Sequence, residues 1–120
     1  MIYPTGNEFS GEWKNDKKNG QGLMLWHSKG EKYEGEWKDN LQHGFGVHLW
    51  MESPSDGKFL RNRYEGSWST GTRDGIGAFY YANGSVYLGE WVKNEKSGFA
   101  IFIDETGEIH QGIFKNDKLL

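Results

Sequence analysis

Apolar and polar residues alternate along the chain in short, recurring stretches. In Tyr33-Glu34-Gly35-Glu36-Trp37, the aromatic and glycine positions share one face, and the two glutamates share the other. This period of two is typical of a β-strand with one buried face. A more apolar stretch follows, which ends in Val47-His48-Leu49-Trp50. The two stretches together predict a β-hairpin.

This pair of stretches recurs with a constant internal spacing. Each of four copies opens with aromatic-x-Gly-x-Trp and reaches a Gly-x-Gly or Gly-x-Ala element eleven residues after its start. The copies begin near residues 9, 33, 64 and 87, and a weaker, partial copy begins at residue 110. The repeated positions are Phe9, Gly11, Trp13, Gly20, Gly22, Tyr33, Gly35, Trp37, Gly44, Gly46, Tyr64, Gly66, Trp68, Gly75, Gly77, Tyr87, Gly89, Trp91 and Gly98. The constant offset predicts one array of hairpins over residues 1–120.

Polar and turn-forming residues separate the predicted strands. Six residues after each Trp, such as 38–43, are predicted to form the turn within a hairpin, and stretches such as 82–85 the turn between hairpins. No stretch shows a sustained apolar period of 3.6, so no helix is predicted. The fold class is therefore all-β.

The repeated glycines have two predicted roles. An aromatic ring can lie flat on a sheet where the neighbouring strand has no side chain, so the Tyr and Trp rings are expected to cover the Gly-x-Gly backbone. Glycine also permits a positive φ where the sheet bends. On this interpretation, a side chain introduced by Gly44→Val displaces a ring.

The repeat resembles the MORN repeat, whose pattern is YxGxW followed by GxG. Tyr33–Trp37 with Gly44 and Gly46 matches this pattern, and the resemblance covers nearly the whole chain. Phe9, Ala100 and the partial copy at His110 depart from it. The resemblance implies a single elongated, twisted antiparallel sheet, a solenoid-like meander of consecutive hairpins. Ten strands would span about 45–50 Å.

The two ends of the array differ from its centre. Residues 1–4 resemble the second strand of an earlier repeat, which suggests a piece of a longer array. The partial copy at the other end is interpreted either as a cap or as a truncated repeat.

Composition narrows the classes of function. The chain has no cysteine. Its formal net charge of −3 argues against nucleic-acid partners, and it disfavours membrane lipid without excluding it. The N-terminus lacks a secretory pattern, and a cytoplasmic location is expected. The histidines His27, His43, His48 and His110 lack ligand spacing, and no catalytic or phosphate-binding motif occurs. Neither catalysis, nor a cofactor, nor a metal is expected.

Two candidate binding regions emerge from the pattern. Both sides of the Gly-x-Gly strands are apolar, so an aromatic groove is expected to bind a peptide or helix unless sheet curvature buries its rings against one another. Its anchors are Trp26, Trp50, Tyr81 and Phe102. The second region is an inserted loop, 51–63, which delays the third copy. It carries the basic and aromatic residues Lys58, Phe59, Arg61 and Arg63, interpreted as a solvated loop or as a contact for an acidic partner.

Three functions fit this description. The insertion before the third copy and the stretch 73–84 resemble the radial spoke head MORN proteins of motile cilia. That resemblance implies a non-catalytic scaffold in the ciliary or flagellar axoneme, bound to spoke-head or cytoskeletal subunits. A phosphoinositide- or membrane-associating module, and a targeting appendage of an enzyme outside this chain, are the alternatives. Pairing of two chains into a homodimer stays open.

Overall fold

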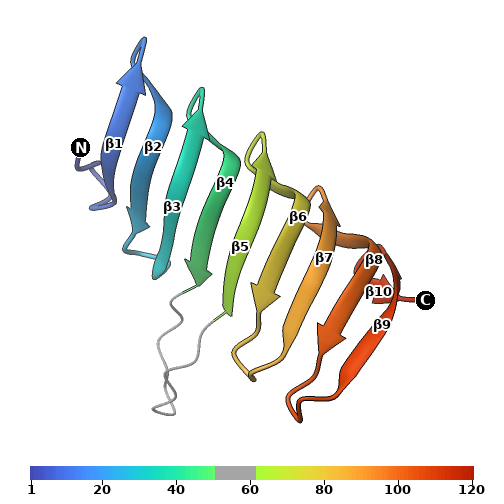
Figure 1. The fold of residues 1–120 in the computed structure, drawn as a ribbon. Helices are drawn as coiled ribbons and strands as arrows, with labels where there is room; N and C mark the ends of the chain where they lie inside the picture. The colour runs from blue at the N-terminus through green and yellow to red at the C-terminus, as the bar shows by residue number, and fades with distance from the viewer. Residues whose placement is uncertain (51–61) are drawn as a thin grey trace.

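The computed structural model describes residues 1–50 and 62–120, and the predicted residues Lys58, Phe59 and Arg61 lie outside them. Ten strands form one open antiparallel sheet in which each strand pairs with the next along the chain (Figure 1). The strands are β1 (Glu8–Lys14), β2 (Lys17–Trp26), β3 (Glu31–Lys38), β4 (Leu41–Trp50), β5 (Asn62–Ser69), β6 (Thr72–Tyr80), β7 (Val86–Val92), β8 (Glu95–Ile103), β9 (Ile109–Lys115) and β10 (Lys118–Leu119). The longest dimension is 45 Å. The predicted all-β meander is confirmed.

The turns within the hairpins are shorter than predicted. Each has two residues with positive φ, as at Asp39 (49°) and Asn40 (71°), and the next strand starts immediately at Leu41. Paired positive φ values match the right-handed twist of the two strands, which explains the frequency of Asn and Asp there. The six-residue turn was wrong because the polar residues after the turn already belong to the second strand.

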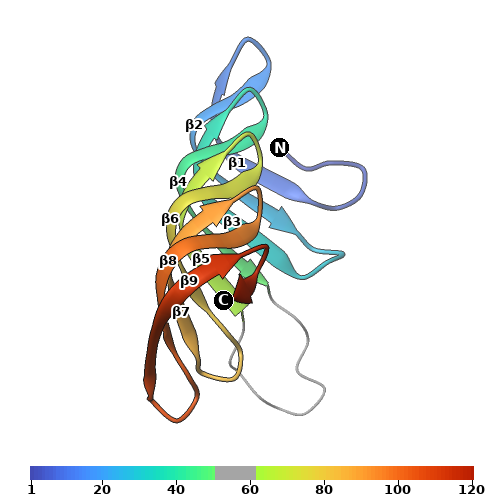
Figure 2. The same cartoon turned by 90° about the vertical axis from the view of Figure 1, so that its right-hand side faces the viewer.

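Each full hairpin bends just after the repeated glycine of its first strand. The register shifts between Gly35 and Trp37, and at the equivalent points of the other three copies. Opposite the shift, the first glycine of Gly-x-Gly has a positive φ, for example 69° at Gly44 and 100° at Gly75. Viewed along the array, the strands form an arc (Figure 2). The predicted use of positive-φ glycine at a bend is confirmed.

The core lies on one side of this single sheet. Its largest fully buried side chains are Phe9, Tyr33, Tyr64 and Tyr87, one from each full repeat. A Cβ added at Gly46 would meet the ring of Tyr33, and one at Gly77 that of Tyr64. Rings therefore cover the second glycine of each Gly-x-Gly, as predicted, but not the first. At Gly44 an added Cβ would meet the Glu36 carboxylate, so the expected ring displacement by Gly44→Val is wrong.

Tryptophan joins successive repeats. The indole Nε1–H of Trp37 donates to the carbonyl of Gly22 at 3.1 Å, and that of Trp91 to Gly77 at 3.3 Å. Trp13, in the first repeat of this sequence, is 42% exposed. The repeats are thus linked by side chains as well as by the ladder of backbone hydrogen bonds.

Short segments flank the full repeats. Ile2 forms an isolated bridge with Glu8, and the Leu119 side chain lies beside Gly112. Among residues 1–50 and 62–120 there is no helix with the length and hydrophobicity to cross a bilayer.

Candidate functional site

The side of the sheet that carries the core is called the aromatic face. The four predicted anchors, Trp26, Trp50, Tyr81 and Phe102, lie on it, each partly buried and packed against the core. Tyr3 and Leu119 contact this face, and the segments that carry them lie inside the arc in Figure 2. The aromatic face is therefore the concave side of the sheet.

Intervening side chains join the four anchors into a continuous row. His48 lies between Trp26 and Trp50, with ring centroids 5.6 and 4.3 Å away. Phe79 similarly lies between Trp50 and Tyr81, at 5.4 and 4.6 Å. Tyr81 reaches Phe102 at 6.3 Å. The anchors are partly buried by these neighbours, and their remaining exposed surface forms one strip that crosses the strands.

His48 is the polar member of this row. Its side chain is buried, and its Nε2 lies 2.9 Å from a carboxylate oxygen of Glu31. Burial lowers its pKa against the opposing effect of Glu31. At physiological pH His48 is therefore neutral, and its ring packs between Trp26 and Trp50.

Cations lie over the rings on the same face. Lys18, Arg73 and Lys96 occupy the position nine residues after a repeat start, and each pairs with the repeat tryptophan across its hairpin. The second repeat has Gln42 there. Sequence reasoning missed this row, although the fixed offset within the repeats was a signal that could have revealed it.

Arg73 is the most enclosed of the three cations. Its guanidinium lies 4.9 Å from the ring centroid of Trp91, 5.5 Å from Trp50 and 5.7 Å from Phe79. It also donates hydrogen bonds to the side-chain and backbone oxygens of Asn94. Burial lowers the pKa of Arg73, although a guanidinium remains charged in proteins. A fixed positive charge therefore lies within the aromatic row.

The two lysines make similar contacts nearer the ends of the array. The Lys18 ammonium lies 5.3 Å from the centroids of Tyr3 and Phe9, and the Lys96 ammonium 5.2 Å from that of Tyr81. Attraction between a cation and an aromatic face holds such heads in place while they stay partly hydrated. All three cations are partly exposed.

A hollow opens at the C-terminal end of the aromatic face. Its volume is 430 Å³, and it is lined by Lys96, Phe102, Asp104, His110, Phe114 and Leu119. Phe102, Phe114 and Leu119 supply apolar surface, while Lys96, Asp104 and His110 supply polar atoms. This arrangement suits an apolar side chain.

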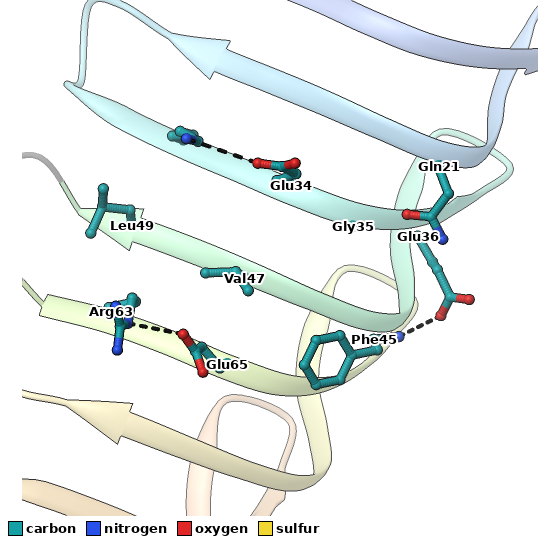
Figure 3. Close-up of a pocket in the computed structure, with 10 residues that line it drawn as sticks. Gln21, Glu34, Gly35, Glu36, Phe45, Val47, Leu49, Arg63 and Glu65 are labelled. Carbon is teal, nitrogen blue, oxygen red and sulfur yellow. Dashed lines mark hydrogen bonds and ion pairs between the residues drawn. The ribbon is translucent and has the colours of Figure 1, made fainter.

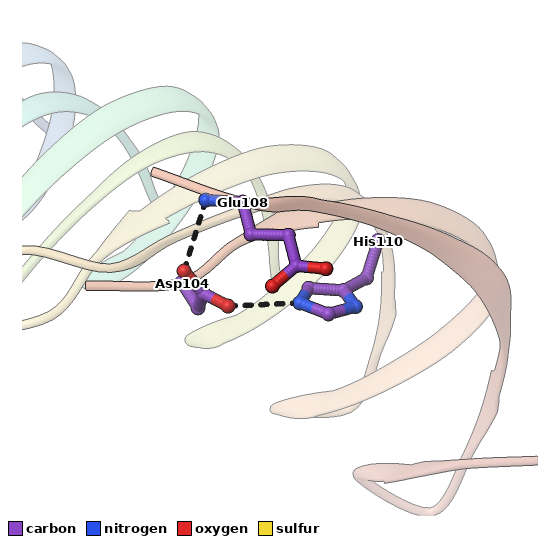
Figure 4. A group of neighbouring side chains, drawn as sticks. All are labelled: Asp104, Glu108 and His110. Carbon is purple, nitrogen blue, oxygen red and sulfur yellow. Dashed lines mark hydrogen bonds and ion pairs between the residues drawn. The ribbon is translucent and has the colours of Figure 1, made fainter. Parts of the chain in front are cut away.

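Three potential ligand groups lie close together beside this hollow. Asp104, Glu108 and His110 are neighbours in Figure 4. The Asp104 carboxylate already accepts hydrogen bonds from Thr106, from the Glu108 backbone and, at 2.9 Å, from His110. These bonds lower the pKa of Asp104 and raise that of His110. The cluster is explained by the turn that it closes.

The opposite side of the sheet, called the outer face, has a hollow of 490 Å³ over β2–β5 (Figure 3). Val47, Leu49 and Phe45 contribute apolar surface, and the Phe45 backbone N–H donates to Glu36 at 2.5 Å. Sequence reasoning did not find this hollow because its walls come from four different strands.

Arg63 belongs to this outer hollow. It was predicted as part of the inserted loop, but it lies within β5 and its Nε is 3.2 Å from the Glu65 carboxylate. Its guanidinium also lies 4.3 Å from the centroid of Tyr80. Pairing and stacking therefore engage Arg63 within the sheet.

Comparison with known proteins identifies the repeat. The MORN repeat family matches residues 9–31, 33–51, 64–86 and 87–109. Alsin of Homo sapiens is 25% identical over 91% of this chain, which spans 8% of alsin. MORN repeat-containing protein 3 of Xenopus laevis is 30% identical over 79% of this chain and 29% of that protein. MORN repeats are non-catalytic modules that generally mediate protein–protein or membrane interactions. This chain belongs to the MORN repeat family.

Proposed function

We propose that this chain is a protein-binding scaffold whose aromatic face holds a segment of another protein. The observation that carries the proposal is the continuous strip formed by Trp26, Trp50, Tyr81 and Phe102 with the rings between them. Exposed aromatic surface of this kind is typical of interaction sites. The rigid ladder of strands holds the strip in place before any partner arrives, which lowers the entropy cost of binding.

The partner that we propose is a subunit of the ciliary radial spoke head, which would place this chain in the axoneme. The support is the sequence resemblance described above, above all the insertion that delays the third repeat. A long surface with repeated contact points suits assembly between subunits.

A second candidate is a targeting segment within a longer protein. This chain spans 8% of alsin and 29% of MORN repeat-containing protein 3, so arrays of this size occur as parts of larger chains. In that case the same aromatic face would direct the remainder of the protein to its partner.

Affinity purification from ciliated cells tests the proposal. The full-length protein that contains this chain is tagged, and its partners are compared with those of a Trp26→Leu/Trp50→Leu variant. An Ile76→Ala/Phe99→Ala variant is the control, because both residues are exposed on the outer face. Thermal unfolding establishes that all three proteins fold.

Spoke-head subunits are expected with the wild type and the control, but not with the aromatic-face variant. Equal recovery with all three proteins would overturn the binding role of this face. Recovery of other proteins alone, dependent on the same tryptophans, would support the scaffold and reject the radial spoke assignment.

A further inference from the structure

We propose that the segment held on the aromatic face is an acidic α-helix whose carboxylates pair with Lys18, Arg73 and Lys96. This inference rests on the proposed function and specifies the chemistry of the partner. It follows from the charges on this face, from their distribution over the molecule and from the spacing of the repeats.

The cations of the aromatic face have no carboxylate partner among the described residues. No carboxylate oxygen in this part of the chain lies within 4.0 Å of the charged groups of Lys18, Arg73 or Lys96. Each charge is held by ring faces instead, and Arg73 also by the neutral side chain of Asn94. A partly exposed charge that only rings hold can still pair with an incoming anion.

The acids near this face are engaged in hydrogen bonds. At the hairpin ends, Asp74 and Asp117 accept from the backbone N–H groups of Lys93 and Lys96. Glu31 is bound to His48, and Asp104 closes its own turn and binds His110. Both lie where one hairpin connects to the next, whereas the cations lie near the two-residue turns at the other end of the strands. The aromatic row therefore has a basic border along one side.

Over the whole chain, basic residues are likewise concentrated at the hairpin ends that carry this border. The five hairpin ends contain nine lysines or arginines but five acids, although the formal net charge of the chain is −3. These ends are residues 14–18, 38–42, 69–74, 92–96 and 115–118. A negatively charged segment is thus attracted to this border and repelled by the remainder of the molecule.

The spacing of the cations matches the period of a helix. Successive repeats are two strands apart, about 9.6 Å. A helix that crosses the strands presents the same face every seven residues, about 10.5 Å. Carboxylates seven residues apart can therefore meet Arg73 and Lys96. A third carboxylate, about fourteen residues from the one that meets Arg73, can meet Lys18, and the helix turn between these two faces Gln42. The apolar side of such a helix then covers the tryptophan row.

A selection experiment tests the spacing directly. The folded protein is used to select from a displayed library of 28-residue helical peptides with one apolar face and with Glu, Gln or Lys at the adjacent positions. Glutamate is expected to be enriched at positions seven residues apart. Enrichment of Lys, the absence of charge preference, or failure to select any helix would overturn the inference.

Matched variants test the residues. The binding constant of the best selected peptide is measured for a triple variant, Lys18→Gln/Arg73→Gln/Lys96→Gln, because Gln42 shows that the repeat accommodates glutamine there. The control, Lys14→Gln/Lys38→Gln/Lys93→Gln, removes the same charge from exposed hairpin ends. The first variant is expected to bind about 30-fold more weakly and the control within about twofold of wild type. Equal losses would indicate diffuse attraction and overturn the pairing.

The experiments separate this inference from the proposed function. If neutral helices bind as tightly as acidic ones, and the binding requires Trp26 and Trp50, the scaffold stands and the acidic helix does not. Sedimentation with phosphoinositide vesicles at physiological salt examines a membrane partner. If wild type and the control variant sediment with the vesicles but Lys18→Gln/Arg73→Gln/Lys96→Gln does not, the three cations bind lipid headgroups. That result would overturn the acidic helix.

Discussion

The indole Nε1–H of Trp68 donates a hydrogen bond to the backbone carbonyl of Gly46 at 3.1 Å, across the boundary between two repeats. Both groups are buried, and the Trp68 ring also lies edge-on to Tyr33 of the preceding repeat. One side chain thus links the strand pairing of its own hairpin to the core of the hairpin before it. Such nearest-neighbour links are what make a repeat array cooperative.

Trp68→Phe is expected to destabilise the protein by about 1–3 kcal/mol, because it leaves the Gly46 carbonyl buried without a partner. Trp13→Phe is the matched change, at a tryptophan that is 42% exposed, and is expected to cost less than about 0.5 kcal/mol. Urea unfolding followed by circular dichroism measures both. Similar costs for the two variants would contradict the link between repeats.

The two glycines of one Gly-x-Gly element are expected to respond differently to substitution. Gly44 requires a positive φ of 69°, which asparagine adopts more readily than valine. Gly44→Val is therefore expected to cost about 1–2 kcal/mol more than Gly44→Asn. The measurement is the difference in unfolding free energy. If Gly44→Asn is as damaging as Gly44→Val, contact with Glu36 rather than φ controls the position.

At Gly46 the ring of Tyr33 is the obstacle, and φ is not positive. Gly46→Ala and Gly46→Asn are therefore both expected to destabilise, by about 1–3 kcal/mol, through overpacking. Gly6→Asn is the control, because its surroundings are open and its positive φ suits asparagine. A tolerated Gly46→Asn, seen as an unchanged urea midpoint, would exclude ring contact as the reason for this glycine.

His48 is expected to make the protein less stable as the pH falls. Its folded pKa lies below the ordinary value of 6.5, so the unfolded chain takes up its proton first as the pH falls. This residue therefore contributes a loss of stability that starts below about pH 6.5. We expect His48→Gln to reduce the fall in melting temperature between pH 7.5 and 5.5.

His110 provides a control of opposite sign. Its pKa is raised by Asp104, so it adds stability at low pH that is lost as the pH rises through its folded pKa. His110→Gln should therefore steepen the fall in melting temperature toward pH 5.5. Parallel pH profiles for the two variants would contradict these assignments.

Arg73 should tolerate lysine poorly although the charge is kept. Its planar guanidinium lies over Trp91 and donates to two oxygens of Asn94, which an ammonium cannot reproduce. We expect Arg73→Lys to cost about 1 kcal/mol, whereas the charge-preserving change Lys38→Arg, at an exposed strand end, is expected to change stability by less than about 0.5 kcal/mol. Chemical denaturation measures both, and a smaller cost at Arg73 would contradict the stacking.

Local pattern was sufficient to predict the repeats, the hairpins and the shared face of the four aromatic anchors. Alternation in Tyr33–Trp37 requires only that neighbouring residues point to opposite sides of a strand, a property of the backbone itself. The same reasoning failed at 38–43, because polar residues at an exposed strand end have the composition of a turn.

Contacts between different strands could not be predicted in this way, because they depend on how each strand is aligned with its neighbour. That alignment, the register, is set only on folding. The positive φ of Gly44 and the shift near Gly35 set how far each strand slides along the next. That offset determines that Trp68 reaches Gly46 and that Arg73 lies over Trp91. The sequence therefore specified which side chains share a face, while folding in three dimensions determined which of them touch, because contact requires a register that no single strand encodes.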